Sequence, residues 1–133
     1  MNPTKTIKVG KIELEMGSGT SQYIPHLAKK FIDHGDILKS IAIGVRDNTA
    51  VLITGESGTG KTSAIRHLAN LTQNGLRRVN LNGGTTADEL VGRLLINAQG
   101  TYWVDGILTE AMREGEWIVL DEINAALPEV LFV

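Results

Sequence analysis

The sequence of 133 residues contains no cysteine, which excludes disulfide bonds, thiolate catalysis and cysteine-based metal sites together. A chain without cysteine fits a cytoplasmic protein, and we expect that location. No run of 18 apolar residues occurs, so the sequence predicts no membrane-spanning segment. Residues 1–10 are polar and no apolar run follows them, so we expect no secretory signal peptide.

Neither sign of charge is in large excess. The sequence contains 13 Lys and Arg and 15 Asp and Glu, which gives a formal net charge of −2. This balance gives no support to a protein that binds nucleic acid through its overall field. The basic pairs Lys29-Lys30 and Arg77-Arg78 are interpreted as solvated surface charges, since short charge runs mostly lie on exposed faces.

The N-terminal part of the chain predicts a small β element followed by helices. Apolar and polar residues alternate over 7–16, which is typical of a strand or small hairpin. The loop at 17–22 is the best candidate for a domain boundary. Helical stretches are predicted over 25–32 and 36–45, the second with Asp36 as its N-cap.

The rest of the chain alternates between strand and helix patterns. The continuous apolar run Ala50–Thr54 predicts a strand buried on both faces of a parallel sheet, and residues 61–75 read as a helix with its stop. Further strands are predicted over 77–82 and 117–120. This order is typical of an α/β fold with a parallel sheet, in which ligands bind beyond the carboxyl ends of the strands.

The sequence between the last two predicted strands indicates shorter elements. Thr86 is expected to cap a helix over 87–91, and residues 94–104 predict a β-hairpin around a Gln-Gly turn. A helix follows over 107–113, and Pro128 opens or kinks a last helical piece.

The segment from Gly55 to Thr62 matches the phosphate-binding pattern G-x-x-x-x-G-K-[ST] at every fixed position. Its glycines let the backbone wrap closely around phosphate, and the following helix adds its positive end. Lys61 supplies a charge for the β- and γ-phosphates, and Thr62 a hydroxyl for Mg²⁺. A chance match is disfavoured, because a strand pattern precedes the motif and a helix pattern follows it. The predicted nucleotide-binding residues are Gly55, Glu56, Ser57, Gly58, Thr59, Gly60, Lys61, Thr62 and Ser63.

An acidic pair, Asp121-Glu122, follows the last apolar strand. We expect Asp121 to hold Mg²⁺ through its water shell and Glu122 to orient and deprotonate the attacking water, the catalytic role. Two carboxylates at the start of a surface loop are the alternative interpretation.

These motifs, with the segments at 79–93 and 102–117, resemble the AAA+ ATPases, and most closely the dynein-related branch that includes midasin and the MoxR-type proteins. The resemblance covers residues 50–131. It implies a three-layer P-loop α/β/α fold with ATP and Mg²⁺ as cofactors. Asn124 and Pro128 belong to the family pattern, and residues 94–104 to the hairpin that interrupts the family's second helix. Members form homo-oligomeric rings that remodel protein partners, and MoxR-type members commonly work with von Willebrand factor A-domain proteins.

By the same resemblance, a sensor residue, an arginine finger and a helical lid would follow Val133, and no residue here is assigned to them. We therefore expect the first part of an AAA+ module, with an N-terminal extension over 1–22 and a partial ATPase core over 23–133. An exposed sheet edge would leave such a chain marginally stable and prone to associate.

Several conspicuous side chains are interpreted as structural. The histidines lack ligand spacing, and the tryptophans are packed anchors, of which Trp103 could also touch a partner. Two arginines could face a neighbouring subunit's nucleotide, but an exposed structural role is preferred. These residues are His26, His34, His67, Trp103, Trp117, Arg93 and Arg113.

Two functions from different classes stay open at this point. One is ATP binding and hydrolysis within a ring ATPase that remodels a macromolecular partner, for which the preference for ATP over GTP is not decided. The other is a nucleotide-binding or oligomerisation module that turns over nothing. A P-loop kinase for small molecules is disfavoured by the sequence around the acidic pair.

Overall fold

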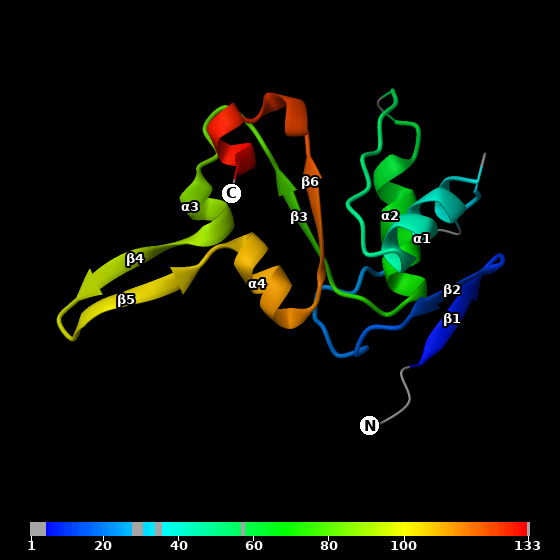
Figure 1. Cartoon of the computed structure of the whole chain (residues 1–133), viewed down its shortest axis with the longest axis horizontal. Helices are drawn as coiled ribbons and strands as arrows, with labels where there is room; N and C mark the ends of the chain where they lie inside the picture. Colours follow the sequence, from blue (N-terminus) through cyan, green and yellow to red (C-terminus); the bar gives the residue numbers. More distant parts are fainter. Residues whose placement is uncertain (1–4, 28–30, 34–35, 57, 133) are drawn as a thin grey trace. The chain divides into compact units, whose positions relative to one another are not determined.

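The computed structural model describes residues 5–27, 31–33, 36–56 and 58–132. These residues form two compact units, Met1–Gly75 and Leu76–Val133, which are described separately below (Figure 1). Within the described ranges, no helix has both the length and the apolar character that crossing a membrane requires. The predicted domain boundary at residue 22 stays a prediction.

The first unit begins with the predicted hairpin, which is confirmed. Strands β1 (Thr6–Val9) and β2 (Ile12–Glu15) pair antiparallel around a turn in which Gly10 has a φ of 62°. Helix α1 (Ile37–Arg46) packs against β2 and against helix α2 (Lys61–Leu71). The core of this unit consists of buried side chains from these elements: Ile12, Leu14, Ile41, Ala42, Ala64, Leu68 and Ala69.

The start of α1 differs from the expectation. Asp36 stands at the N-cap position with a left-handed backbone (φ 59°), and its side chain makes no capping hydrogen bond. The carboxylate of Asp33 accepts a hydrogen bond from the backbone N–H of Ile37 at 3.1 Å instead. The predicted capping role of Asp36 is therefore wrong, although the helix itself is confirmed.

The helix predicted over 25–32 is wrong for the described residues, since 25–27 and 31–33 are not helical, while 28–30 lie outside the description. Helix α2 uses the carbonyl groups of this segment. Asn70 Nδ2 donates to the carbonyl of Pro25 at 2.9 Å, and Arg66 donates to that of His26 at 3.3 Å. Tertiary hydrogen bonds thus replace the local helical ones.

The strand predicted over Ala50–Thr54 is also wrong. In the described part of the chain, the sheets are the pairs β1-β2, β3-β6 and β4-β5, and none includes this segment (Figure 1). Leu52 is 75% exposed and Val51 is 42% exposed. A continuous apolar run favours burial, but a strand forms only by hydrogen bonding to a neighbouring strand. No described neighbour supplies these bonds.

The second unit contains the parallel pair that the pattern predicted. Strands β3 (Leu76–Asn80) and β6 (Trp117–Asp121) run parallel, with Asn80 opposite Asp121. The crossover between them includes α3 (Ala87–Val91) and α4 (Ile107–Glu114), both confirmed helices. The α/β fold class is therefore confirmed.

The core of the second unit lies between the strand pair and the short elements around it. Leu81, Leu90 and Val130 are almost fully buried there, with Val79 and Leu120 packed against them. Val130 comes from the last 3-10 helix, η2 (Pro128–Phe132).

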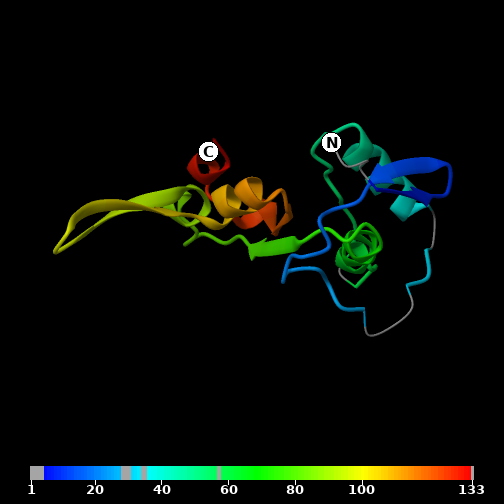
Figure 2. The ribbon, with the colours of Figure 1, turned by 90° about the horizontal axis from the view of Figure 1, so that it is seen from below.

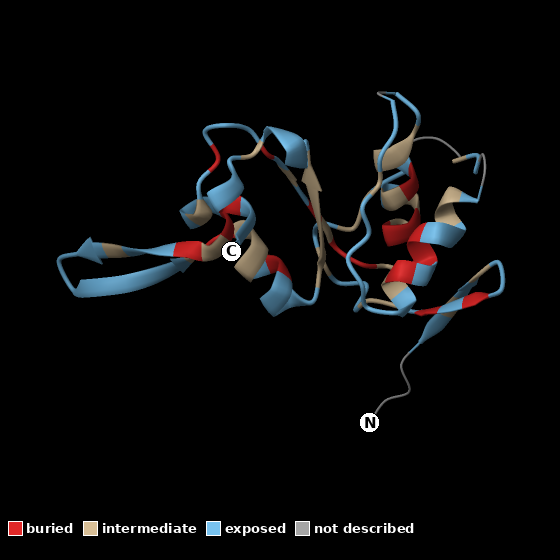
Figure 3. Cartoon of the chain, turned by 45° about the horizontal axis from the view of Figure 1, so that its top comes forward, coloured by how far each residue is buried: buried red, intermediate tan, exposed pale blue. Residues whose placement is uncertain are grey.

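Strands β4 (Gly92–Asn97) and β5 (Gly100–Asp105) form the predicted hairpin. Figures 1 and 2 show it extending away from α3 and α4, and Figure 3 shows that most of its surface is exposed. Exposed apolar side chains lie on it, among them Leu94, Ile96 and Trp103. Next to the base of the hairpin, Thr109 and Gly106 donate hydrogen bonds to the carbonyl of Val91, the last residue of α3.

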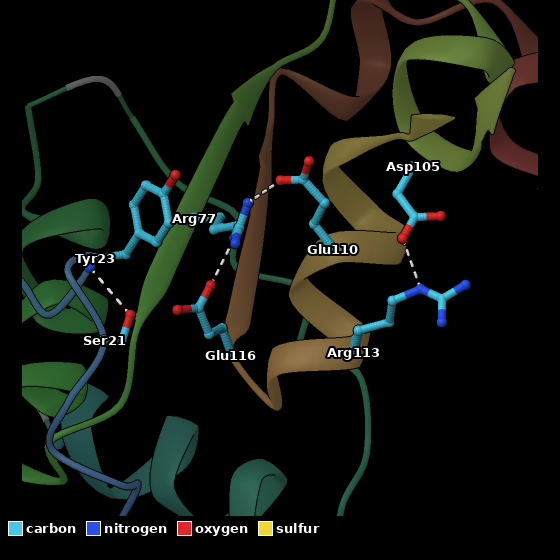
Figure 4. Close-up of polar contacts among 7 residues, drawn as sticks. All are labelled: Ser21, Tyr23, Arg77, Asp105, Glu110, Arg113 and Glu116. Atoms are coloured by element: carbon cyan, nitrogen blue, oxygen red, sulfur yellow. Dashed lines mark hydrogen bonds and ion pairs between the residues drawn. The ribbon is translucent and has the colours of Figure 1, made fainter. Parts of the chain in front are cut away.

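The alternation of β3 separates the two adjacent arginines. Arg77 lies beneath α4, where its Nε donates to Glu116 Oε2 at 2.5 Å and its terminal nitrogen pairs with Glu110 (Figure 4). Its side chain is 9% exposed, whereas that of Arg78 is 58% exposed. The interpretation of Arg77 as a solvated surface charge is therefore wrong. Lys29 and Lys30 lie outside the described residues.

Candidate nucleotide-binding site

The glycine-rich loop has the backbone geometry that close wrapping requires. Gly55, Gly58 and Gly60 have φ values of 150°, 79° and 87°, which other residues rarely adopt. A Cβ atom at Gly58 or Gly60 would meet nothing within 4 Å. These two glycines therefore serve the backbone conformation and not tight packing, and the space beside them is open. Ser57 lies outside the described residues.

The amine of Lys61 lies within this loop. Its Nζ donates to the carbonyl oxygens of Gly55 at 2.7 Å and Glu56 at 2.5 Å, while Thr59 Oγ1 donates to the same Glu56 carbonyl at 2.9 Å. The loop thus closes around the lysine, which brings a positive charge to the start of α2. Gly60 at the N-cap offers no side chain to this helix. Unsatisfied N–H groups and the helix dipole therefore add to the attraction for an anion.

Thr62 and Ser63 occupy the first turn of α2, as the motif predicts. Thr62 is half-buried and Ser63 is exposed. The hydroxyl of Thr62 is a hard oxygen donor of the kind that Mg²⁺ prefers.

Asp121 ends β6, where the sheet delivers it beside the end of β3. Its backbone carbonyl accepts a hydrogen bond from Leu81 N at 2.9 Å, and its carboxylate forms an ion pair with Arg78 Nε. The Asp121 side chain is 23% exposed. The main chain of Asp121 is thus held by Leu81 and its side chain by Arg78.

Glu122 follows directly with a φ of 54°, a left-handed conformation that is uncommon for residues other than glycine. It precedes the 3-10 helix η1 (Ile123–Ala125), and its carbonyl accepts from Ala125 N at 2.8 Å. The chain therefore turns after Asp121, and the Glu122 side chain is exposed. Strained backbone of this kind often occurs at functional positions.

The structure brings the predicted residues together in two groups. The phosphate loop, Gly55 to Ser63, belongs to the first unit, and the acidic pair belongs to the second. The meeting of the two groups at one nucleotide stays a prediction.

Within the described ranges, no three His, Cys, Asp or Glu side chains gather as a metal site. A Mg²⁺ ion held by one carboxylate and one hydroxyl needs phosphate oxygens and water to complete its shell, which is its usual mode in nucleotide sites. The hydroxyl of Thr62 and the carboxylate of Asp121 are each of the oxygen-donor type that this mode uses, and their binding of one ion stays a prediction.

Sequence reasoning missed Arg78 as a neighbour of the acidic pair. The signal was present in the alternation of β3, because Arg78 lies two residues before Asn80 and therefore on the same face as Asp121. Using this signal would have required the pairing of β3 with β6, which a single sequence does not reveal.

The packed role predicted for Trp103 is wrong, because this residue is 48% exposed on the hairpin. His67 stacks on Phe31 with ring centroids 5.3 Å apart, so its interpretation as a packing histidine is confirmed. Asp105 accepts a hydrogen bond from Trp103 Nε1 at 2.6 Å and pairs with Arg113 at 2.6 Å (Figure 4). Arg113 is an exposed arginine that joins α4 to the hairpin. His34 lies outside the described residues.

A parallel strand pair covered by helices, with a glycine-rich loop closing on a lysine before a helix, defines a P-loop α/β protein. A family model for the AAA domain (dynein-related subfamily) matches residues 50–133. Midasin of Dictyostelium discoideum is 40% identical over 92 residues, covering 66% of this chain and 2% of midasin. The denitrification regulatory protein NirQ of Stutzerimonas stutzeri is 45% identical over 83 residues, covering 62% and 30%. Protein NorQ of Paracoccus denitrificans is 33% identical over 103 residues, covering 77% and 38%.

The family model covers more than half of the chain, so the chain belongs to the AAA domain family, in its dynein-related subfamily. The resemblance seen in the sequence is confirmed. Members of this family typically bind ATP with Mg²⁺ and oligomerise. The chain spans between 2% and 38% of the length of the three relatives named above.

Proposed function

We propose that this chain binds ATP with Mg²⁺ through Gly55–Ser63 and hydrolyses it as part of a cytoplasmic AAA+ ring that remodels a macromolecular partner. The observation that carries the proposal is the closure of the loop on the Lys61 amine at the start of α2. A cation and free amide groups at a helix N-terminus form a site for a polyanion. Membership of the AAA family supports ATP as that polyanion.

Each residue has a defined task in this proposal. The loop amides and Lys61 hold the β- and γ-phosphates. Thr62 and Asp121 hold Mg²⁺, which when bound neutralises the charge that develops on the phosphoryl oxygens. Glu122 orients the attacking water and takes its proton, and its position directly after the metal-binding carboxylate supports hydrolysis over transfer to another substrate.

The alternative is a module that binds nucleotide and oligomerises without turnover. The observation that favours it is that the phosphate loop and the acidic pair belong to separate compact units of the chain. Hydrolysis requires the two groups to meet at one nucleotide, whereas binding requires only the first.

Turnover separates the two functions. We expect the chain to release phosphate from ATP at a rate that rises steeply with protein concentration, because a ring completes each site from a neighbour. Glu122→Gln should abolish turnover and keep ATP binding, while Glu114→Gln, an exposed carboxylate at the end of α4, should change neither. Binding of ATP with Mg²⁺ and no turnover above the Glu122→Gln variant would leave the non-catalytic module as the function.

A further inference from the structure

Arg78 and Asp121 lie on the same face of the β3-β6 pair. Asn80 stands opposite Asp121 in the register, and Arg78 precedes Asn80 by two residues. Side chains two residues apart in a strand point to the same face, so the guanidinium reaches diagonally across to the acidic side chain. Arg77 points to the opposite face, where it pairs with Glu110 and Glu116.

The contact is made through one nitrogen and one oxygen. Arg78 Nε donates to Asp121 Oδ2, and among the described residues Oδ1 has no hydrogen-bond partner. The backbone of Asp121 is fixed independently, because Leu81 N donates to its carbonyl at 2.9 Å. The sheet therefore holds the main chain, while the contact with Arg78 engages one oxygen of the carboxylate and restricts its rotation.

We propose that Arg78 is a positioning residue, which holds the carboxylate of Asp121 so that its second oxygen is presented to the magnesium ion of a bound nucleotide. The proposal rests on the function proposed above and extends it to a residue outside both motifs. Arg78 itself touches neither metal nor phosphate.

General chemistry supports this role. Carboxylates that bind a metal are usually held by hydrogen bonds of their own, and loss of such a partner typically weakens metal affinity about 10- to 100-fold. An arginine donates in a fixed plane and so orients a carboxylate better than a flexible lysine does. The acceptor is the less exposed partner, with 23% of the Asp121 side chain exposed against 58% for Arg78.

An opposing effect is the repulsion between the guanidinium and a metal cation. The Arg78 side chain is 58% exposed, so water screens its charge. If orientation dominates, removing the arginine weakens Mg²⁺ binding. If repulsion dominates, removing it strengthens Mg²⁺ binding, so an experiment can decide between the two.

The test measures binding of a fluorescent ATP analogue to the full chain, in EDTA and across a MgCl₂ titration. We expect Arg78→Gln to leave analogue binding in EDTA unchanged. It should raise about 10-fold the Mg²⁺ concentration at which the Mg²⁺-dependent increase in analogue binding is half-maximal. Arg78→Lys should recover part of this loss, because it keeps the charge without the Nε donor. Arg46→Gln, which removes an exposed arginine paired with Asp47, is the matched control and should behave as wild type.

A double-mutant cycle with Asp121→Asn distinguishes positioning from a general structural effect. Once Asp121 has lost its charge, Arg78→Gln should cause no further change in the Mg²⁺ titration. Circular dichroism checks that each variant is folded. If Arg78→Gln does not fold, the Mg²⁺ titration of Arg78→Lys tests the positioning role instead.

The outcomes separate this inference from the proposed function. A wild-type chain that binds no nucleotide with Mg²⁺ would overturn both. Normal binding by the wild type, with an unchanged or lower Mg²⁺ requirement in Arg78→Gln, would overturn the positioning role alone.

Discussion

Arg77 at the start of β3 and Glu116 just before β6 form an ion pair of 2.5 Å, and both side chains are less than one-tenth exposed. Glu110 of α4 contacts the same guanidinium from the other side. Removing one member of a buried pair leaves an uncompensated charge, which typically costs about 3–5 kcal/mol.

The first prediction concerns this cluster. Arg77→Ala should lower the free energy of unfolding by about 3 kcal/mol, because Glu116 is left buried without its partner. Arg78→Ala is the matched control on the adjacent residue, and it should cost less than about 1 kcal/mol because its pair is solvated. Urea unfolding of both variants provides the comparison, and equal losses would contradict the separation of the two arginines to opposite faces.

The second prediction concerns the phosphate loop. Gly58→Ala should weaken nucleotide binding about 10-fold, since a left-handed backbone costs an L-residue about 1–2 kcal/mol. The cause is conformational, because the added Cβ would meet nothing within 4 Å. Gly83→Ala has the same open surroundings without a positive φ, so it should bind as wild type. Equal affinities for the two variants in an equilibrium binding assay would remove the conformational argument.

Local chemistry in the sequence predicted elements whose hydrogen bonds are made nearby. The Thr86 hydroxyl caps α3 by accepting from Glu89 N at 3.3 Å, and the β4-β5 hairpin forms as its alternation indicates. The phosphate loop and the acidic pair could be predicted as site residues because their chemistry is encoded in short, fixed spacings.

What escaped prediction depends on partners distant in sequence. The run at 50–54 has the composition of a buried strand, but no described strand pairs with it. The carbonyl groups of Pro25 and His26 accept hydrogen bonds from side chains of α2, some forty residues away in sequence. Arg78 could be connected with Asp121 only through the register of β3 against β6. Such contacts follow from tertiary structure, which composition and periodicity do not contain.

The third prediction concerns the pair at the end of α1. The hydrogen bond and charge of Arg46 lower the pKa of Asp47. A carboxyl group whose pKa falls on folding contributes stability above its unfolded pKa, and that contribution is lost as the pH falls through the folded pKa. We expect NMR titration to place the pKa of Asp47 below its ordinary value and Arg46→Gln to raise it. An unchanged pKa in the variant would show that the pair does not persist in solution.

The fourth prediction concerns the exposed apolar side chains of the hairpin. Ile96 is 81% exposed and Leu94 is 65% exposed, and both lie on the same face of β4. Apolar surface of this kind favours association between molecules. Replacing both residues with serine should shift sedimentation towards the monomer and leave the free energy of unfolding within about 0.5 kcal/mol of wild type, because neither side chain contributes to a core.

A core substitution supplies the contrast for that experiment. Leu90 is 1% exposed in the centre of the second unit, so Leu90→Ala should cost about 2–5 kcal/mol through loss of burial and the cavity that remains. If the double serine variant also lost several kcal/mol while its sedimentation stayed the same, the hairpin would be a stabilising element of its unit and not a surface that drives association.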